Sequence, residues 1–157
     1  RQPVLLYRPF AKEGEATENI ARVAVALDGS DFSERILPVA AEMAKSLGAR
    51  LMLLQVLPAG PSLPSVPGET KSDSDESSYL HRLAAKLKYE SAIDCDWEVL
   101  HGDPAEAICR YVKDMRETLL ALTTHARGGL ERAMLGSVAA ACIRHAGVPL
   151  LVYWPKD

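Results

Sequence analysis

Short apolar runs alternate with longer segments of helical period along this chain, and no other feature restricts its fold as strongly. Residues 22–27 form one apolar run, which ends at an Asp-Gly turn, and residues 51–57 form a second run without polar alternation. Such runs are typical of strands that are buried on both faces of a parallel sheet. Strands that alternate with helices therefore predict an α/β fold with helices on both faces of the sheet.

Three further strands and four helices complete the pattern, so we expect a sheet of five strands. The strands are expected at 119–124, at 148–153 and around Trp97 and Val99, where alternating acidic residues indicate a sheet edge. The helices are expected at 32–47, 80–87, 104–115 and 138–146. Gly48 stands where a C-cap glycine belongs, and Asp103 stands where an N-cap belongs.

Length and composition fit one globular domain. The chain has 157 residues, of which 48% are apolar and 25% are charged, as is ordinary for a domain with a buried core. We expect this domain to span residues 20–157, after an N-terminal extension at 1–19. Residues 58–78 are rich in proline, serine and acidic residues, so burial does not offset the entropy of ordering them. We expect a mobile loop there rather than a regulatory lid.

Charge and cysteine content exclude several classes of protein. A net charge of −3 gives no broad basic surface for nucleic acid and no polybasic patch for an anionic membrane. No apolar run approaches the roughly 18 residues that a membrane span requires. Cys95, Cys109 and Cys142 are widely spaced and odd in number, which favours reduced thiols in a cytoplasmic protein over a disulfide framework.

Common catalytic and phosphate-binding motifs are missing from the sequence. It contains no Gly-x-x-x-x-Gly-Lys-Ser/Thr, no Gly-x-Gly-x-x-Gly and no Gly-x-Ser-x-Gly, and its four histidines share no metal-ligand spacing. We therefore expect no catalytic residue, no resident metal site and no fast chemistry.

Two turns are candidates for a binding site, because open parallel sheets bind ligands beyond the carboxyl ends of their strands. Asp28 follows the first strand, and residues 123–137 follow the fourth. Gly136 and Ser137 would present free N–H groups and a hydroxyl at a helix N-terminus, which favours an anion, and Arg127 adds a cation suited to phosphate. Taken alone, these residues are explained equally well as an N-cap serine and turn glycines.

The segment LTTHARGGLERAMLGSV at 122–138 resembles the nucleotide-binding signature of the universal stress protein family. That signature spaces Gly, two residues, Gly, nine residues, then Gly and Ser or Thr. The resemblance extends over about residues 20–153 and includes VAVALDGS at 23–30 and GVPLLV at 147–152. It implies a five-stranded parallel sheet with helices on both faces, of the Rossmann-like or flavodoxin-like type, as in the adenine nucleotide alpha hydrolases.

The resemblance also implies a site for ATP or a related adenine nucleotide, with or without Mg²⁺. Asp28 would contact the ribose or an associated metal, Ala26 would line the adenine side, Leu27 would belong to the same cofactor-binding set, and backbone groups of Val56 would face adenine. The segment that would follow the ribose and phosphates consists of Thr123, Thr124, His125, Ala126, Arg127, Gly128 and Gly129. The terminal phosphates would be held by Gly136, Ser137 and Val138.

The chain departs from this signature at Thr123 and Ala126, where the family has glycines. Each added Cβ costs about 1–2 kcal/mol if the backbone needs a positive φ there. Three functions therefore stay open. They are a stress-response regulatory module that binds ATP and is coupled to dimerisation, a nucleotide-free dimerisation scaffold, and a weak ATPase.

The sequence QPVLLYRP at 2–9 parallels VPLLVYWP at 148–155. This internal echo predicts that residues 1–9 are the closing strand of a preceding, similar domain in a tandem protein; a private extension is the alternative. In the family that the chain resembles, last strands pair across a dimer, because an exposed strand edge is a template for another strand. We expect residues 4–7 to pair with 150–153, within the chain as a pseudo-dimer or across a homodimer.

Overall fold

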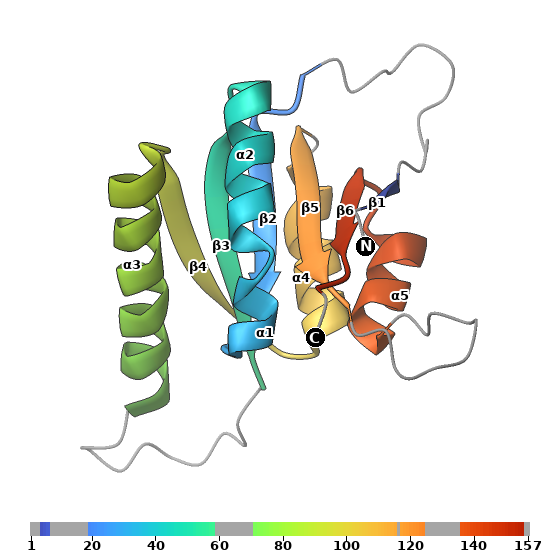
Figure 1. Ribbon diagram of the computed structural model, residues 1–157. Coiled ribbons are helices and arrows are strands. Elements are labelled where there is room, and N and C mark those ends of the chain that lie inside the picture. The colour runs from blue at the N-terminus through green and yellow to red at the C-terminus, as the bar shows by residue number, and fades with distance from the viewer. Residues whose placement is uncertain (1–3, 7–18, 59–70, 116, 125–135, 156–157) are drawn as a thin grey trace.

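The computed structural model describes residues 4–6, 19–58, 71–115, 117–124 and 136–155 (Figure 1). Its sheet has six strands in the order β1-β6-β5-β2-β3-β4. The strands are β1 (Val4–Leu6), β2 (Arg22–Leu27), β3 (Arg50–Leu57), β4 (Cys95–His101), β5 (Thr118–Thr123) and β6 (Leu150–Tyr153). Strands β2 to β6 run parallel, whereas β1 runs antiparallel to β6. The predicted five-stranded parallel sheet is confirmed, and the N-terminal extension adds a sixth strand.

Helices cover both faces of the sheet. They are α1 (Asp31–Glu34), α2 (Leu37–Leu47), α3 (Lys71–Ser91), α4 (Pro104–Lys113) and α5 (Ser137–His145). Helices α2 and α3 pack on one face with Val23, Val25 and Leu27 of β2, whereas α4 and α5 pack on the other with Ala24 and Ala26. The central strand is thus covered on both sides, which is why its sequence lacks polar alternation.

A break divides the helix that the periodicity predicts at 32–47. Helix α1 ends at Glu34 and α2 begins at Leu37, with a turn between them. Pro38 explains the break, because proline has no N–H to donate and its ring would clash with the Glu34 carbonyl in a continuous helix. The N-cap of α1 is Ser30, whose Oγ accepts a hydrogen bond from the Ser33 N–H at 3.1 Å.

Other helix ends and the sheet edge agree with the sequence prediction. Gly48 ends α2 in the left-handed conformation, with φ at 65°. Asp103 caps α4, because its Oδ1 accepts a hydrogen bond from the Glu106 N–H at 2.9 Å. Strand β4 lies at the edge of the sheet, with Trp97 half-buried and Glu98 exposed.

Helix α3 begins earlier than the sequence predicts. It starts at Lys71, so residues 71–78 are helical, whereas we expected them to belong to the loop at 58–78. Downstream, Leu80, Leu83 and Leu87 pack into the core and anchor the helix. Once a helix is anchored, each residue added upstream contributes a hydrogen bond, and this cooperative growth outweighs the polar composition. Residues 59–70, and the mobility predicted for them, lie outside the described residues. Among the described helices, none is long and apolar enough to cross a bilayer.

The N-terminal strand β1 pairs with the last strand of the same chain. The register places Val4, Leu5 and Leu6 opposite Val152, Leu151 and Leu150. In Figure 1, β1 lies beyond β6, where the sheet would otherwise end on an open strand edge. The predicted pairing is confirmed within the chain for these residues. Tyr7 lies outside the described residues, and pairing across a homodimer stays a prediction.

Candidate functional site

The candidate site lies where the chain reverses its direction of winding around the sheet. Strand β2 sits between β3 and β5, and the register pairs Ala26 with both Leu54 and Leu122. From β2 the chain passes to α1 and α2 on one face, whereas α5, which follows β5, packs on the other face. Ligands of open α/β sheets bind at such a switch point, outside the carboxyl ends of the strands.

Asp28 follows β2 and is held by the turn that starts α1. Its Oδ1 accepts a hydrogen bond from the Ser30 N–H at 3.0 Å and another from the Ser30 hydroxyl. Burial by itself raises the pKa of this carboxyl, but the hydrogen bonds, chiefly from Ser30, outweigh burial and hold the pKa of Asp28 below its ordinary value. The side chain is exposed and ionised at neutral pH, so it suits a cation or a sugar hydroxyl.

Gln55 lies buried beside the same turn, and the sequence analysis did not predict it as part of the site. Gly29 has a φ of 81°, and a Cβ added there would lie 3.2 Å from the Gln55 Nε2. Gln55 is only 5% exposed, and its Oε1 has no hydrogen-bond partner among the described residues. The backbone of the turn therefore passes directly beside the Gln55 amide. The available signal was that Gln55 is the single polar residue in the apolar run 51–57.

Thr124 connects the end of β5 with the start of α5. It is 3% exposed, and its N–H donates to the Tyr153 carbonyl at 3.0 Å. Its Oγ1 accepts a hydrogen bond from the Gly136 N–H at 3.0 Å. The expectation that Gly136 offers a free N–H to a ligand is therefore wrong, because that donor already bonds to Thr124.

The remaining donors at this helix start belong to the first three helical residues, among them Ser137 and Val138. Gly136, not Ser137, is the N-cap of α5, and it provides no side-chain cap. Because Ser137 and Val138 are the first two residues of the helix, their N–H groups have no acceptor inside it and point toward its N-terminal end. A Cβ added at Gly136 would lie 3.7 Å from the Thr124 Oγ1, which is ordinary van der Waals contact. Within the described part of the chain, a Cβ at this position therefore meets no clash.

The predicted nucleotide-binding residues at the ends of β2 and β3 do not share one face of the sheet. Ala26 and Val56 are half-buried beside the core under α4 and α5. Leu27 is buried on the opposite face, in the core under α2 and α3, so its side chain is separated from theirs. Thr123 is half-buried at the end of β5. The predicted residues His125, Ala126, Arg127, Gly128 and Gly129 lie outside the described residues.

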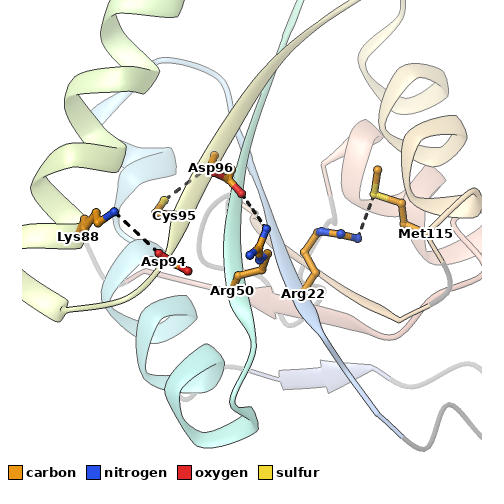
Figure 2. A network of polar contacts seen from close by, with 7 residues as sticks. All are labelled: Arg22, Arg50, Lys88, Asp94, Cys95, Asp96 and Met115. Carbon is orange, nitrogen blue, oxygen red and sulfur yellow. Dashed lines mark hydrogen bonds and ion pairs between the residues drawn. The ribbon is translucent and has the colours of Figure 1, made fainter.

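A polar network lies at the opposite, amino-terminal ends of the strands, as Figure 2 shows. Arg50 Nη1 pairs with Asp96 Oδ2 at 3.2 Å, and Lys88 Nζ lies 3.9 Å from Asp94 Oδ1. These ion pairs are exposed and contribute little stability. In the described parts of the chain, no group of three or more His, Cys, Asp or Glu side chains is arranged to hold a metal ion. This network therefore adds no candidate for a resident metal.

The sequence matches the family model of the universal stress protein family over residues 19–153. The chain belongs to this family. A universal stress protein of Methanocaldococcus jannaschii is 28% identical over 137 residues, which cover 83% of this chain and 80% of that relative.

Solved structures of universal stress proteins share the fold. One from Archaeoglobus fulgidus superposes with a TM-score of 0.74 at 22% identity and covers 98% of this chain, which spans 51% of that protein. A universal stress protein in complex with cAMP superposes with a TM-score of 0.67 at 21% identity, covering 88% of this chain and 100% of that one. This universal stress protein domain thus spans about half of the first structure and matches the whole of the second.

Proposed function

We propose that this universal stress protein binds an adenine nucleotide, ATP with Mg²⁺, at the carboxyl ends of β2 and β5, and that occupancy regulates its assembly during stress. One observation carries the proposal. The ionised carboxylate of Asp28 and the N–H groups at the start of α5 that have no acceptor within that helix follow two adjacent strands at the switch point. A nucleotide that carries a ribose, a metal ion and phosphates matches both.

Six of the described residues have a role in this proposal. Asp28 would bind the ribose or Mg²⁺, since Mg²⁺ keeps most of its waters and takes only one or two carboxylates besides phosphate oxygens. Ala26 and the backbone of Val56 would contact adenine. The N–H groups of Ser137 and Val138 would bind phosphate, while Gly136 would leave the phosphates room to approach. The cAMP complex of a protein with the same fold supports the class of ligand.

A second role, as an assembly scaffold, is favoured by the pairing of β1 with β6. We propose that β1 stands in for the last strand of a neighbouring, similar domain. The domain would then be one half of a tandem pseudo-dimer, and a homodimer through β6 would require β1 to leave. The superposition with the Archaeoglobus fulgidus universal stress protein supports this proposal, because it covers 98% of this chain but only 51% of that longer protein.

Nucleotide binding is tested most directly by two measurements on the purified protein. Mass analysis of small molecules released on denaturation should identify a co-purified adenine nucleotide. Thermal unfolding should shift upward with ATP and Mg²⁺, because a ligand at 100 times its dissociation constant adds about 2.7 kcal/mol to the stability of the folded state. No nucleotide and no shift at millimolar ATP would favour the scaffold role.

The location of the site is tested with a matched pair of carboxylate variants. Asp28→Ala should weaken ATP binding at least tenfold, which corresponds to about 1.4 kcal/mol. Asp31→Ala removes an equal charge three residues further along, in the first turn of α1, and should change the affinity less than twofold. Isothermal titration gives both dissociation constants. Equal losses for the two variants would place the nucleotide elsewhere.

A further inference from the structure

The fold brings two of the three cysteines into contact. Cys109 on α4 and Cys142 on α5 are 33 positions apart in the sequence, yet their sulfur atoms lie 3.9 Å from each other. Both are free thiols, and both are buried, Cys109 at 7% exposure and Cys142 at 0%. A disulfide bond of about 2.05 Å would require the two sulfurs to approach by about 2 Å, which places the pair close to bonding.

A groove gives access to one member of the pair. It lies between α4 and α5, has a volume of about 490 Å³, and is lined by Ala105, Cys109, Arg110, Lys113, Ala141 and His145, among others. A groove of this volume admits a small organic molecule. Cys109 is part of its lining, whereas Cys142 is not, so a molecule in the groove meets the Cys109 side chain first.

We propose that Cys109 and Cys142 form a redox-active dithiol, which a low-molecular-weight disulfide entering the groove between α4 and α5 oxidises to a disulfide. In the first step, the Cys109 thiolate attacks one sulfur of the small disulfide. The S–S bond of that molecule breaks, one small thiolate leaves and takes up a proton, and Cys109 carries a mixed disulfide.

In the second step, the Cys142 sulfur attacks the Sγ of Cys109, and the Cys142 proton passes to the small thiolate that leaves. The second small thiolate leaves and is protonated. Two protein thiols are thereby oxidised to one disulfide, and one small disulfide is reduced to two thiols. Burial raises the pKa of Cys142, which keeps it a thiol until Cys109 has reacted. The order of the two steps therefore follows from access, because the groove is lined by Cys109 and not by Cys142.

The third cysteine is a built-in control. Cys95 is half-buried at the start of β4, on the other face of the sheet, and its Sγ donates to the Asp96 carbonyl at 3.8 Å. It contacts neither of the other cysteines, because Cys109 on α4 and Cys142 on α5 belong to the core on the opposite face of the sheet. A Cys95→Ser chain isolates the proposed pair.

The experiment treats native Cys95→Ser protein with 4,4′-dithiodipyridine, a small neutral disulfide that releases a coloured thione at each exchange. We expect two equivalents of thione per chain and no retained pyridyl group. Intact mass should fall by two hydrogen atoms, and a proteolytic peptide should link Cys109 to Cys142. A stable pyridyl adduct on Cys109, a disulfide between two chains, or no reaction until the protein is unfolded would each overturn the proposal.

Two further variants in the same background separate the steps. Cys142→Ala should release one equivalent and keep the pyridyl group on Cys109. Cys109→Ala should react at least tenfold more slowly, because the remaining thiol is fully buried. Similar rates for the two variants would contradict the entry route through Cys109. Circular dichroism verifies that each variant is folded, and if one is not, the peptide map of the Cys95→Ser chain alone decides.

Discussion

Thr124 has two bonding roles at the end of β5, and they depend on different atoms. The N–H of Thr124 bonds to β6, while its hydroxyl oxygen accepts the Gly136 N–H. Thr124→Val keeps the shape of the side chain and removes only the acceptor, so we expect a loss of about 1 kcal/mol in the free energy of unfolding. Urea unfolding monitored by circular dichroism measures it.

Its neighbour Thr123 provides the control for this prediction. Thr123 is half-buried, and within the described part of the chain its hydroxyl has no hydrogen-bond partner. Thr123→Val should therefore change the stability by less than about 0.5 kcal/mol. If both variants unfold at the same urea concentration, the hydrogen bond to Gly136 contributes nothing.

Asp28 makes the stability of the fold sensitive to acid. Hydrogen bonds hold its pKa below the ordinary value of 3.8 in the folded chain. A carboxyl of this kind stabilises the fold fully above its unfolded pKa, and the contribution is lost as the pH falls through the folded pKa. Between about pH 5 and pH 2.5, the wild type should thus lose more stability than Asp28→Asn. Urea midpoints across this range measure the difference, and parallel curves would contradict it.

The candidate site is predictable from sequence only where position in the chain carries the information. Asp28 ends an apolar run, so its place at the carboxyl end of a strand follows from the pattern. Gln55 and the Cys109–Cys142 pair depend instead on which segments lie side by side in the fold. That Gly136 uses its N–H internally could not be predicted either, because the acceptor is a threonine hydroxyl 12 positions earlier.

Among the secondary-structure elements, α2 ends in a way that a single substitution tests. Gly48 has a φ of 65°, and among the residues that the structure describes no heavy atom lies within 4 Å of a Cβ added there. The cost of Gly48→Ala is therefore conformational, about 1–2 kcal/mol, because an L-residue disfavours the left-handed region. Gly48→Asn should cost less, since asparagine adopts that region more readily. Thermal unfolding measures both variants. Equal stability of the alanine variant and the wild type would contradict a left-handed Gly48 at the end of α2.

The strands follow from the sequence more closely than the helices do. The apolar run at 22–27 begins with Arg22 and is followed by Asp28, and β2 has the same limits. The helical period from Phe32 to Leu47 contains no gap, and only the missing N–H and the ring of Pro38 divide it. For residues 71–78 the composition favours a loop, but a helix anchored by Leu80 extends through them, so a long-range contact decides the local structure.

For the whole molecule, the pairing of β1 with β6 predicts the effect of truncation. Deleting residues 1–9 removes β1 and leaves one side of β6 without a hydrogen-bonded neighbour. Such an edge is a template for another strand, so we expect the truncated protein to form dimers or aggregates. Light scattering after size-exclusion chromatography gives the mass.

Deletion of residues 1–3 is the matched control, because it shortens the chain and keeps β1 (Val4–Leu6). This variant should have the same mass and unfolding temperature as the full chain. If deletion of 1–9 also leaves mass and stability unchanged, β1 does not protect the edge, and the proposed pseudo-dimer fails with it.

The hydrogen bond between Thr124 and Gly136 joins the end of β5 to the start of α5. The separation of these points is then fixed by the scaffold and not by whatever sequence connects them. A substitution at Ala126 or Arg127 would therefore leave the spacing between the end of β5 and the start of α5 unchanged, and the two halves of the candidate site would keep their places.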